Sequence, residues 1–231
     1  MENGSFIKEI AHIETEFVEK FGIPRQSGLV EELKGRIVFE PEYRTWDAFK
    51  GLEDYSHIWV IWQFSKAVRS NWSATVKPPR LGGNKRMGVF ATRSPFRPNP
   101  IGLSCLKLDR ICQDEKLGTV LYVSGVDMVS GTPIYDIKPY LAYADSHPEA
   151  SGGFADKVKD YKLQVFFSDG MRELLSAEEA ICIEKIIEQD PRPSYIDDPQ
   201  RIYGVTYGEH NVKFRVEGKK ATVIDIEEKY I

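Results

Sequence analysis

The sequence predicts a mainly β protein, with a closed or strongly curved β architecture over about the first 150 residues and a small α/β unit after them. Short runs rich in β-branched and aromatic residues follow one another up to residue 129, separated by Gly, Pro and Asp turns. No strong amphipathic helical pattern of more than about two turns interrupts these runs. The segment 144–160 then has the composition of a linker, and a helical pattern follows it.

The strands of the first part are predicted from apolar runs at 6–17, 36–40, 57–64, 87–92, 103–112 and 119–129. The stretch LDRICQDEKLGTVLYV at 108–123 predicts a β-hairpin, because a polar turn separates two apolar runs. A short helix is compatible with residues 45–56. The sequence contains neither a G-x-G-x-x-G turn nor a G-x-x-x-x-G-K-[ST] loop, so a nucleotide-like ligand would need a site other than a Rossmann crevice or a P-loop.

A small α/β unit is predicted after the linker. Ser176 and Glu179 form a capping box in front of a helix at 177–190, which the sequence DPRPSY ends. The predicted apolar stripe of this helix consists of Ala177, Ala180, Ile181, Ile183, Ile186 and Ile187. NVKFRV, EGKK and ATVIDI predict a second hairpin at 211–226. We therefore expect a main domain at 1–145, a linker at 146–160 and a small domain at 161–231 that packs on the main domain.

Composition narrows the class of protein. A chain of 231 residues with 42% hydrophobic content can bury a large core, so disorder is not expected. No run of about 18 apolar residues and no signal-peptide pattern is present, which predicts a cytoplasmic protein without membrane association. The cysteines show no Cys-x-x-Cys spacing, which favours reduced, buried thiols; they are Cys105, Cys112 and Cys182. The histidines show no spacing typical of metal ligands, which predicts no metal site; they are His12, His57, His147 and His210.

Charge is unevenly distributed along the chain. The net charge is −4, but residues 55–108 contain no Asp or Glu and nine Lys or Arg residues. A buried strand excludes charged residues, which explains the lack of Asp and Glu in about the first ten residues of this window. The rest have the Gly- and Pro-rich composition of exposed loops, which favours a basic surface that binds a polyanion.

The stretch GVFATRSPFRPNPIGLS at 88–104 predicts a rigid loop. Pro95, Pro98 and Pro100 lack backbone N–H donors, and each forces the residue before it into an extended conformation. One interpretation is a Pro-rich corner that joins two strands; the other is a loop whose unpaired backbone groups bind a polar ligand. The segments 78–86 and 131–140 are also interpreted as turn-rich polar loops, and three such loops favour a common site.

These motifs resemble the TsaA-like (YaeB-like) family. The resemblance is carried by KFGIPRQSGLV, GLEDYSHIWV, VKPPRLGGNKR, MGVFATRSPFRPNPIGLS and GTPIYDIKPYL, and by QDPRPSY and HNVKFRV near the C-terminus. It implies a single-sheeted β-barrel and a homodimer with the cofactor near the subunit interface. It also implies an S-adenosylmethionine-dependent methyltransferase that acts on N6 of N6-threonylcarbamoyladenosine, next to the anticodon of tRNA. Methyl transfer from a sulfonium is an in-line displacement, which needs alignment rather than a metal or a covalent intermediate.

The resemblance also implies roles for individual residues. The expected cofactor-binding residues are Pro24, Arg25, Gln26, Arg93, Leu103, Thr132, Pro133, Ile134, Tyr135 and Asp136, with Ser65 and Lys66 expected to contribute through their backbone. The expected tRNA phosphate contacts are Arg80, Lys85, Arg86 and Arg97, and Arg97 is also a candidate for the cofactor carboxylate. Ser130 stands where family members commonly have Asp, so no carboxylate is expected there. No residue is identified as a general base.

Several alternatives stay open at this point. The chain could be a non-catalytic RNA-binding module, or a methyltransferase of the same fold that acts on another nucleotide or small molecule. Asp136 and Lys138 could form a plain surface ion pair. Trp59 and Trp62 are expected in the core rather than as a platform for bases. Asp190, Arg192 and Tyr195 either end a helix or contact tRNA or a second subunit.

Overall fold

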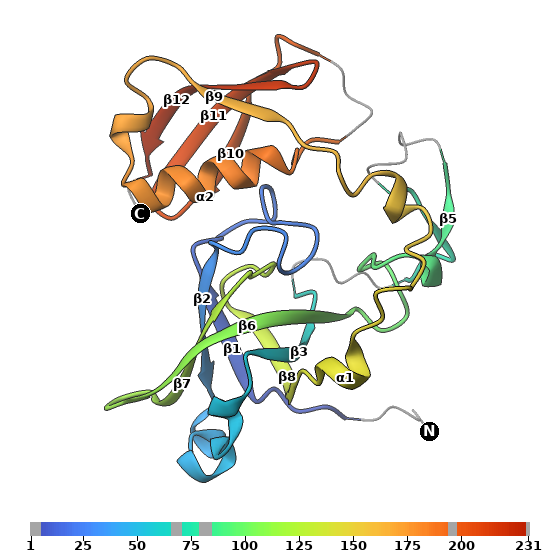
Figure 1. The fold of residues 1–231 in the computed structure, drawn as a ribbon, viewed down its shortest axis with the longest axis vertical. Helices are drawn as coiled ribbons and strands as arrows, with labels where there is room; N and C mark the ends of the chain where they lie inside the picture. The colour runs from blue at the N-terminus through green and yellow to red at the C-terminus, as the bar shows by residue number, and fades with distance from the viewer. Residues whose placement is uncertain (1–5, 66–70, 79–84, 194–197, 230–231) are drawn as a thin grey trace. The chain divides into compact units, whose positions relative to one another are not determined.

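The computed structural model describes residues 6–65, 71–78, 85–193 and 198–229 (Figure 1). The chain divides into two compact units. The barrel unit consists of Met1–Thr15, Gln26–Trp72 and Pro95–Leu141. The C-terminal unit consists of Ala142–Ile231 together with two earlier segments, Glu16–Arg25 and Ser73–Ser94.

Six antiparallel strands form a closed barrel in the first unit (Figure 1). Their order around the barrel is β1, β2, β7, β6, β3, β8. Their bounds are Ala11–Thr15 for β1, Lys34–Phe39 for β2, His57–Gln63 for β3, Ile101–Asp114 for β6, Gly118–Ser124 for β7 and Thr132–Pro139 for β8. The expected mainly β fold and the single-sheeted barrel are both confirmed.

The core of the barrel follows from strand alternation. In β3, Ile58, Val60 and Trp62 are buried, while the residues between them are half-buried on the outer face. The indole of Trp62 lies in the core, as expected. Trp59 is instead half-buried and packs against Tyr140, with ring centroids 5.8 Å apart.

The predicted hairpin at 108–123 is formed by β6 and β7. Asp114 Oδ1 accepts hydrogen bonds from the backbone N–H groups of Lys116 (2.8 Å) and Leu117 (2.9 Å), and Gly118 has a φ of 68°. These two backbone donors lower the pKa of the Asp114 carboxyl. A side chain that bonds its own turn is a local signal, which explains why the sequence was sufficient to place this hairpin.

Three predicted elements differ from the structure. The segment 131–140, interpreted as a polar loop, contains strand β8, which pairs with β1 on one side and β3 on the other. The predicted strand at 87–92 reduces to Met87–Gly88 (β5), which pairs with Thr75–Val76 (β4), followed by a 3-10 turn at Val89–Ala91. Residues 45–56 form 3-10 turns at Trp46–Phe49 and Leu52–Asp54 after another at Pro41–Tyr43, rather than one helix.

The C-terminal unit contains a four-stranded sheet in the order β10, β11, β12, β9. Its strands are β9 at Gln164–Phe167, β10 at Tyr203–Tyr207, β11 at His210–Glu217 and β12 at Lys220–Glu228. Its helices are the short α1 at Ala142–Asp145 and the longer α2 at Ala177–Glu188. Two 3-10 turns lie at Ala155–Lys157 and Arg172–Leu174. The hairpin of β11 and β12 confirms the prediction at 211–226. Strand β9 adds to the sheet parallel to β12.

Helix α2 begins as predicted, with a capping box between Ser176 and Glu179. Its buried face differs slightly from the predicted stripe. Ile183, Ile186 and Ile187 are buried, but Ile181 is 41% exposed and Cys182 is buried instead. The expectation of buried thiols therefore holds for Cys182, whereas the other two cysteines are half-buried, and all three are free.

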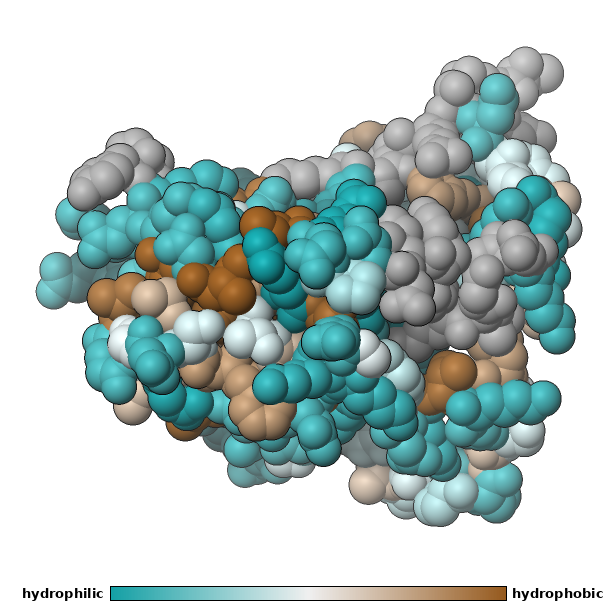
Figure 2. Space-filling view, turned by 90° about the horizontal axis from the view of Figure 1, so that it is seen from above, coloured by the Kyte–Doolittle hydropathy of each residue, from teal (hydrophilic) through white to brown (hydrophobic). Residues whose placement is uncertain are grey.

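In the part of the chain that the structure describes, none of the helices has the length and apolar character needed to cross a membrane. Among the residues that Figure 2 colours by hydropathy, most are hydrophilic, with small groups of hydrophobic residues between them.

Candidate functional site

Several of the expected cofactor-binding residues lie at one rim of the barrel. At this rim the strands β1, β3 and β7 end and the strands β2, β6 and β8 begin, as the pairs Ile13↔Thr132, Gln63↔Ile101 and Lys34↔Ser124 show. We call it the Thr132 rim. It carries Gln26 in the connection from β1 to β2, Ser65 just after β3, Leu103 near the start of β6, and Thr132 at the start of β8.

A β-bulge sets the direction of the side chains in β8. Ile61 of β3 pairs with Asp136, but the next residue, Trp62, pairs with Ile134, so Tyr135 is the extra residue of the bulge. Ile134 is fully buried beside Trp62. The bulge therefore leaves Tyr135 and Asp136, two consecutive residues, both half-buried on the outer side. Without it, one of the two would point into the core.

Thr132 and Ile134 have buried side chains, and the Thr132 hydroxyl donates to the carbonyl of Val129 at 2.7 Å. These two residues can present only backbone groups to a ligand at the surface. The side chains of Pro133, Tyr135 and Asp136 are half-buried and reach the surface.

Tyr135 forms a polar pair with Gln63, a residue to which the sequence motifs gave no role. The Tyr135 hydroxyl donates a hydrogen bond to Gln63 Oε1. Burial raises the pKa of Tyr135, and the negative charge of Glu9 adds to the effect, so the hydroxyl keeps its proton at neutral pH. The pair consists of a protonated hydroxyl and an amide at the end of β3, which are hydrogen-bonding groups suited to a polar ligand.

Asp136 forms the ion pair that the sequence left open. Its Oδ2 lies 2.8 Å from Lys138 Nζ, and its Oδ1 accepts from the backbone N–H of Ile137 at 2.9 Å. The side chains of Asp136 and Lys138 are 44% and 63% exposed, so solvent screens their attraction and the pair contributes little to stability.

A buried polar chain supports the rim from inside. Trp62 Nε1 donates to Ser104 Oγ at 2.9 Å, and Ser104 Oγ donates to Asp127 Oδ1 at 2.7 Å. Gly102 is needed beside this chain, because a Cβ atom there would lie 2.2 Å from the Trp62 ring. Ser104 and Asp127 were not singled out in the sequence. The signal that could have found Ser104 is a polar residue at an inward position of an alternating strand.

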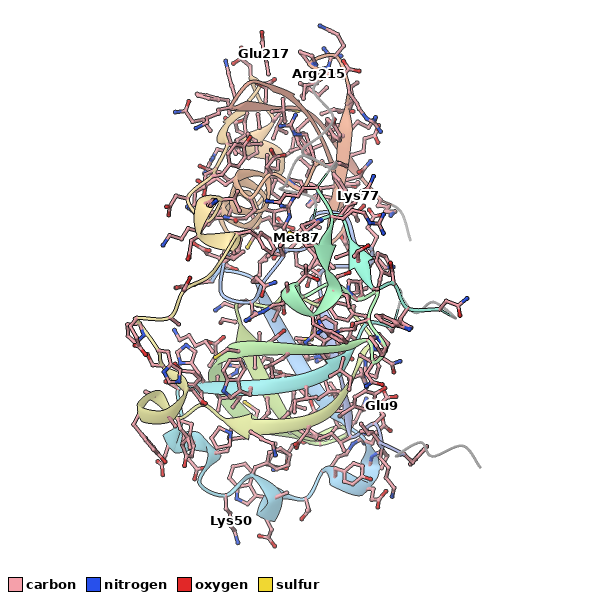
Figure 3. The ribbon with its side chains drawn as sticks, turned by 90° about the vertical axis from the view of Figure 1, so that its right-hand side faces the viewer. Glu9, Lys50, Lys77, Met87, Arg215 and Glu217 are labelled. Carbon is pink, nitrogen blue, oxygen red and sulfur yellow. The ribbon has the colours of Figure 1, made fainter. Side chains whose placement is uncertain are left out.

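A pocket of about 500 Å³ lies at the opposite rim of the barrel. Its walls come from the end of β2, the 3-10 turns after it, and the end of β8, and include Phe39, Phe49, Tyr55 and Pro139. Lys50, labelled in Figure 3, belongs to this lining. Of the expected cofactor residues that the structure describes, only Asp136 borders it. The expected cofactor residues at the Thr132 rim and this pocket therefore lie at different ends of the barrel, although Gly51, Leu52 and Tyr55 of the motif GLEDYSHIWV line the pocket.

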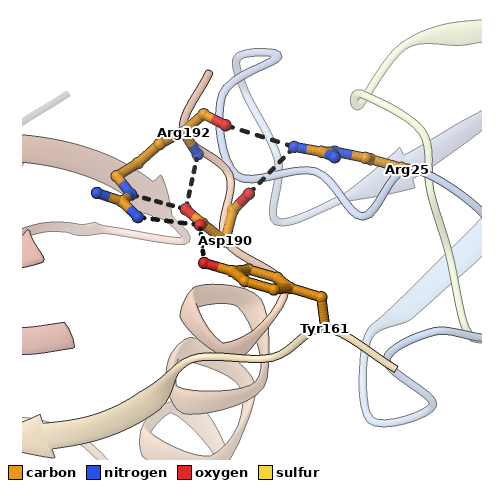
Figure 4. Close-up of polar contacts among 4 residues, drawn as sticks. All are labelled: Arg25, Tyr161, Asp190 and Arg192. Atoms are coloured by element: carbon orange, nitrogen blue, oxygen red, sulfur yellow. Dashed lines mark hydrogen bonds and ion pairs between the residues drawn. The ribbon is translucent and has the colours of Figure 1, made fainter. Parts of the chain in front are cut away.

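The C-terminal unit contains the other expected cofactor residues, Pro24, Arg25 and Arg93. Pro24 is buried and Arg93 is exposed. Arg25 Nη2 donates to the backbone carbonyls of Asp190 (3.1 Å) and Arg192 (3.4 Å), as Figure 4 shows. The guanidinium therefore contacts the turn that ends α2, a role that the sequence did not predict.

This turn is built on a buried ion pair. Asp190 Oδ1 lies 2.7 Å from Arg192 Nε, Asp190 Oδ2 lies 3.0 Å from Arg192 Nη2, and both side chains are 9% exposed. The Tyr161 hydroxyl donates to Asp190 Oδ2 at 3.2 Å. Burial opposes the charge of Arg192, but the hydrogen bonds and the charge of Asp190 outweigh it and raise the Arg192 pKa. The helix-stop interpretation is confirmed for these two residues.

The expected tRNA contacts are distributed over both units. Arg86 donates to Thr75 Oγ1 (2.7 Å) and to the Thr75 carbonyl (3.1 Å), so it stabilises the β4–β5 ladder. Met87 belongs to this ladder and Lys77 directly follows β4 (Figure 3). Lys85 is exposed, and Arg97 is half-buried in the barrel unit. Lys66, Arg80 and Tyr195 lie outside the described residues.

Comparison with known proteins identifies the family. The family model of the tRNA-methyltransferase O N-terminal domain matches residues 12–146, and that of the TrmO C-terminal domain matches residues 160–229. The chain belongs to the tRNA-methyltransferase O family. The resemblance found in the sequence motifs is thereby confirmed.

Relatives in the tRNA-methyltransferase O family cover nearly the whole chain. The tRNA (adenine(37)-N6)-methyltransferase of Escherichia coli is 40% identical over 218 residues, which are 90% of this chain and 92% of that protein. A Pseudomonas aeruginosa relative, named as a putative S-adenosylmethionine-dependent methyltransferase, is 39% identical over 207 residues, which are 86% of this chain and 87% of that protein. A crystal structure of TrmO from Pseudomonas aeruginosa matches 99% of each chain with a TM-score of 0.78 and 33% identity.

Proposed function

We propose that this protein transfers a methyl group from S-adenosylmethionine to N6 of adenosine 37 in tRNA, and that its substrate is the N6-threonylcarbamoylated form. The supporting observation is the match of both family models, which together span the barrel and the C-terminal sheet. The Escherichia coli relative named for this reaction aligns over 90% of the chain. We also propose that the protein acts in the cytoplasm, and that its domains are 1–145 and 161–231, joined by a linker at 146–160.

The residues of the Thr132 rim fit a cofactor with polar ends and an apolar middle. Gln26 and the Gln63–Tyr135 pair supply hydrogen-bonding groups, and Leu103, 53% exposed, supplies an apolar surface. When bound, S-adenosylmethionine supplies an electrophilic methyl group. The contribution of the chain is to align the cofactor with the target amine and to exclude water, through groups held by the β-bulge and by the buried chain of Trp62, Ser104 and Asp127.

Binding of tRNA is proposed to depend on the basic window of the sequence. Residues 55–108 carry nine Lys or Arg and no acidic residue, and Lys85 within it is exposed. Neutralising phosphates releases counterions from the nucleic acid, so the affinity should fall steeply with salt. The acidic remainder of the chain does not oppose this, because exposed charges more than about 10 Å apart are screened at physiological salt.

A homodimer is proposed from the outer face of the barrel. Leu103 pairs with Ile61 and Ile101 pairs with Gln63, so these side chains share one face beside Trp59. Leu103 and Ile101 are 53% and 38% exposed. A second copy would cover this apolar surface. We expect light scattering to show a dimer for the wild type and a monomer for Leu103→Asp; a wild-type monomer would contradict the proposal.

The reaction is tested by nucleoside mass spectrometry. Threonine tRNA, with and without the threonylcarbamoyl group, is incubated with the protein and S-adenosylmethionine. We expect the mass of one methyl group to be added to threonylcarbamoyladenosine alone. Methylation of unmodified adenosine 37 would contradict the proposal that the substrate is the N6-threonylcarbamoylated form. No methylation of either tRNA would overturn the proposed function.

The cofactor site is tested with Arg93, an exposed residue of the segment 88–104 that was predicted to be a rigid loop. We expect Arg93→Ala to weaken the affinity for S-adenosylhomocysteine and to slow methylation. A variant that methylates as well as the wild type would remove Arg93 from the site.

A further inference from the structure

The connection between β1 and β2 leaves the barrel and forms part of the C-terminal unit over Glu16–Arg25. The backbone N–H of Gly208 donates to the carbonyl of Glu16 at 3.1 Å. The ring of Phe17, which is 1% exposed, packs edge-on against Tyr207 with centroids 5.5 Å apart. The start of this segment is therefore fixed to strand β10 and the turn after it.

Contacts with β10 continue along the segment. The Thr206 hydroxyl donates to Glu19 Oε1. Gly22, with a φ of 96°, lies so close to β10 that a Cβ atom would be 2.1 Å from Val205 Cγ2. Such a close approach, with a positive φ, makes this a position for glycine.

The last residue of the segment is fixed by the turn after α2. Arg25 donates two hydrogen bonds to the carbonyls of Asp190 and Arg192, and the Asp190–Arg192 ion pair holds that turn in shape (Figure 4). Asp190 has a φ of 47°, a conformation that side chains other than Asn and Asp rarely adopt. The acceptors for Arg25 thus depend on a strained and buried turn.

The chain re-enters the barrel unit immediately after Arg25. Ser27 Oγ accepts from the backbone N–H of Cys105 at 3.1 Å, and the N–H of Gly28 donates to the carbonyl of Gly125 at 2.9 Å. Gln26, one of the expected cofactor residues, therefore follows Arg25, which is bonded within the C-terminal unit, and precedes Ser27, which is bonded within the barrel unit.

We propose that the Asp190–Arg192 turn of the C-terminal unit positions the cofactor-binding segment Pro24–Gln26 by holding Arg25. Asp190 is thus a positioning residue for cofactor binding, although it lies more than 160 residues from this segment in the sequence. This inference rests on the proposed function, because it takes Pro24–Gln26 as part of the cofactor site. The C-terminal unit then contributes to cofactor affinity in addition to any contact with tRNA.

The test measures S-adenosylhomocysteine affinity by titration calorimetry on the full chain. Asp190→Asn keeps the size of the side chain and tolerates the positive φ, but it removes the charge that pairs with Arg192. We expect its Kd to rise about tenfold, which corresponds to about 1.4 kcal/mol. Glu188→Gln is the matched control: Glu188 pairs with Lys162 and Lys185 near the same turn, and none of its described contacts is with Arg25. Its Kd should equal that of the wild type.

A double-mutant cycle separates positioning from direct contact. Arg25→Met removes both hydrogen bonds to the turn and any contact of Arg25 with the cofactor. If Asp190 acts through Arg25, the double variant binds S-adenosylhomocysteine no more weakly than Arg25→Met alone. Effects that multiply would overturn the proposal.

Hydrogen exchange supplies a readout that does not depend on the cofactor. Asp190→Asn should speed exchange of the amides of residues 16–26, and unchanged exchange together with unchanged Kd would overturn the proposal. If Asp190→Asn fails to fold, Tyr161→Phe takes its place, because it removes one hydrogen bond to Asp190. We expect Tyr161→Phe to raise the Kd for S-adenosylhomocysteine and to speed exchange of the amides of residues 16–26, each by a smaller factor. No change in either would overturn the proposal. A wild type that binds no S-adenosylhomocysteine would overturn the proposed function itself, whereas equal binding by all variants would overturn only this inference.

Discussion

Gly22 lies where the segment 16–25 crosses strand β10, and its replacement by alanine measures how tightly this segment is packed. Its φ of 96° is unfavourable for any residue with a Cβ atom. The added methyl would lie 2.1 Å from Val205 Cγ2 and 3.6 Å from Ile186 Cγ2, and both of these side chains are fully buried. The clash cannot be relieved by turning a side chain into solvent.

Two costs add up in Gly22→Ala. The positive φ costs about 1–2 kcal/mol, and the overlap in a packed core costs about 1–3 kcal/mol, so we expect about 2–5 kcal/mol of destabilisation. Gly170→Ala in the same unit separates the two costs. Gly170 has a φ of 76° but nothing within 4 Å of its Cβ position, so only the first cost applies. The difference between the two variants is the packing cost.

Urea unfolding followed by two signals provides the assay. All four tryptophans lie in the barrel unit, so their fluorescence reports on the barrel, whereas far-UV circular dichroism also reports on the C-terminal sheet and α2. We expect Gly22→Ala to lower the circular dichroism midpoint well below that of Gly170→Ala. Equal midpoints for the two variants would refute the close packing of this segment on β10.

Three further predictions concern other parts of the molecule. Ser104→Ala removes the acceptor of the buried Trp62 indole N–H and should destabilise the barrel by about 1–3 kcal/mol in urea unfolding followed by fluorescence; an unchanged midpoint would contradict the buried chain. Hydrogen bonds from Ser176 lower the pKa of Glu179 below its ordinary 4.5, so its contribution to stability is present above that pH and is lost as the pH falls through the lowered value. Glu179→Gln should therefore flatten the acid side of the stability profile measured by circular dichroism, and an unaltered profile would refute this. Lys85→Ala should reduce the slope of log affinity for tRNA against log salt by about 1 in filter binding, and an unchanged slope would exclude a phosphate contact.

The candidate site was only partly predictable from the sequence. The long motifs identified the family and the segments of the Thr132 rim. They did not reveal that Thr132 and Ile134 are buried, or that Gln63 pairs with Tyr135. Those facts depend on the bulge in β8, which arises from its register with β3 and leaves no trace in the local pattern.

The sequence by itself determined the features that arise between residues close along the chain. These include the Asp114 turn of the β6–β7 hairpin, the Ser176–Glu179 capping box and the end of α2 before DPRPSY, because each rests on hydrogen bonds or steric limits within a few residues. Only the tertiary structure decided that β8 is a strand and that Arg25 contacts the Asp190–Arg192 turn. A Pro-containing polar segment becomes a strand when two distant strands supply partners for its backbone, and an arginine finds acceptors more than 160 residues away only after the chain has folded.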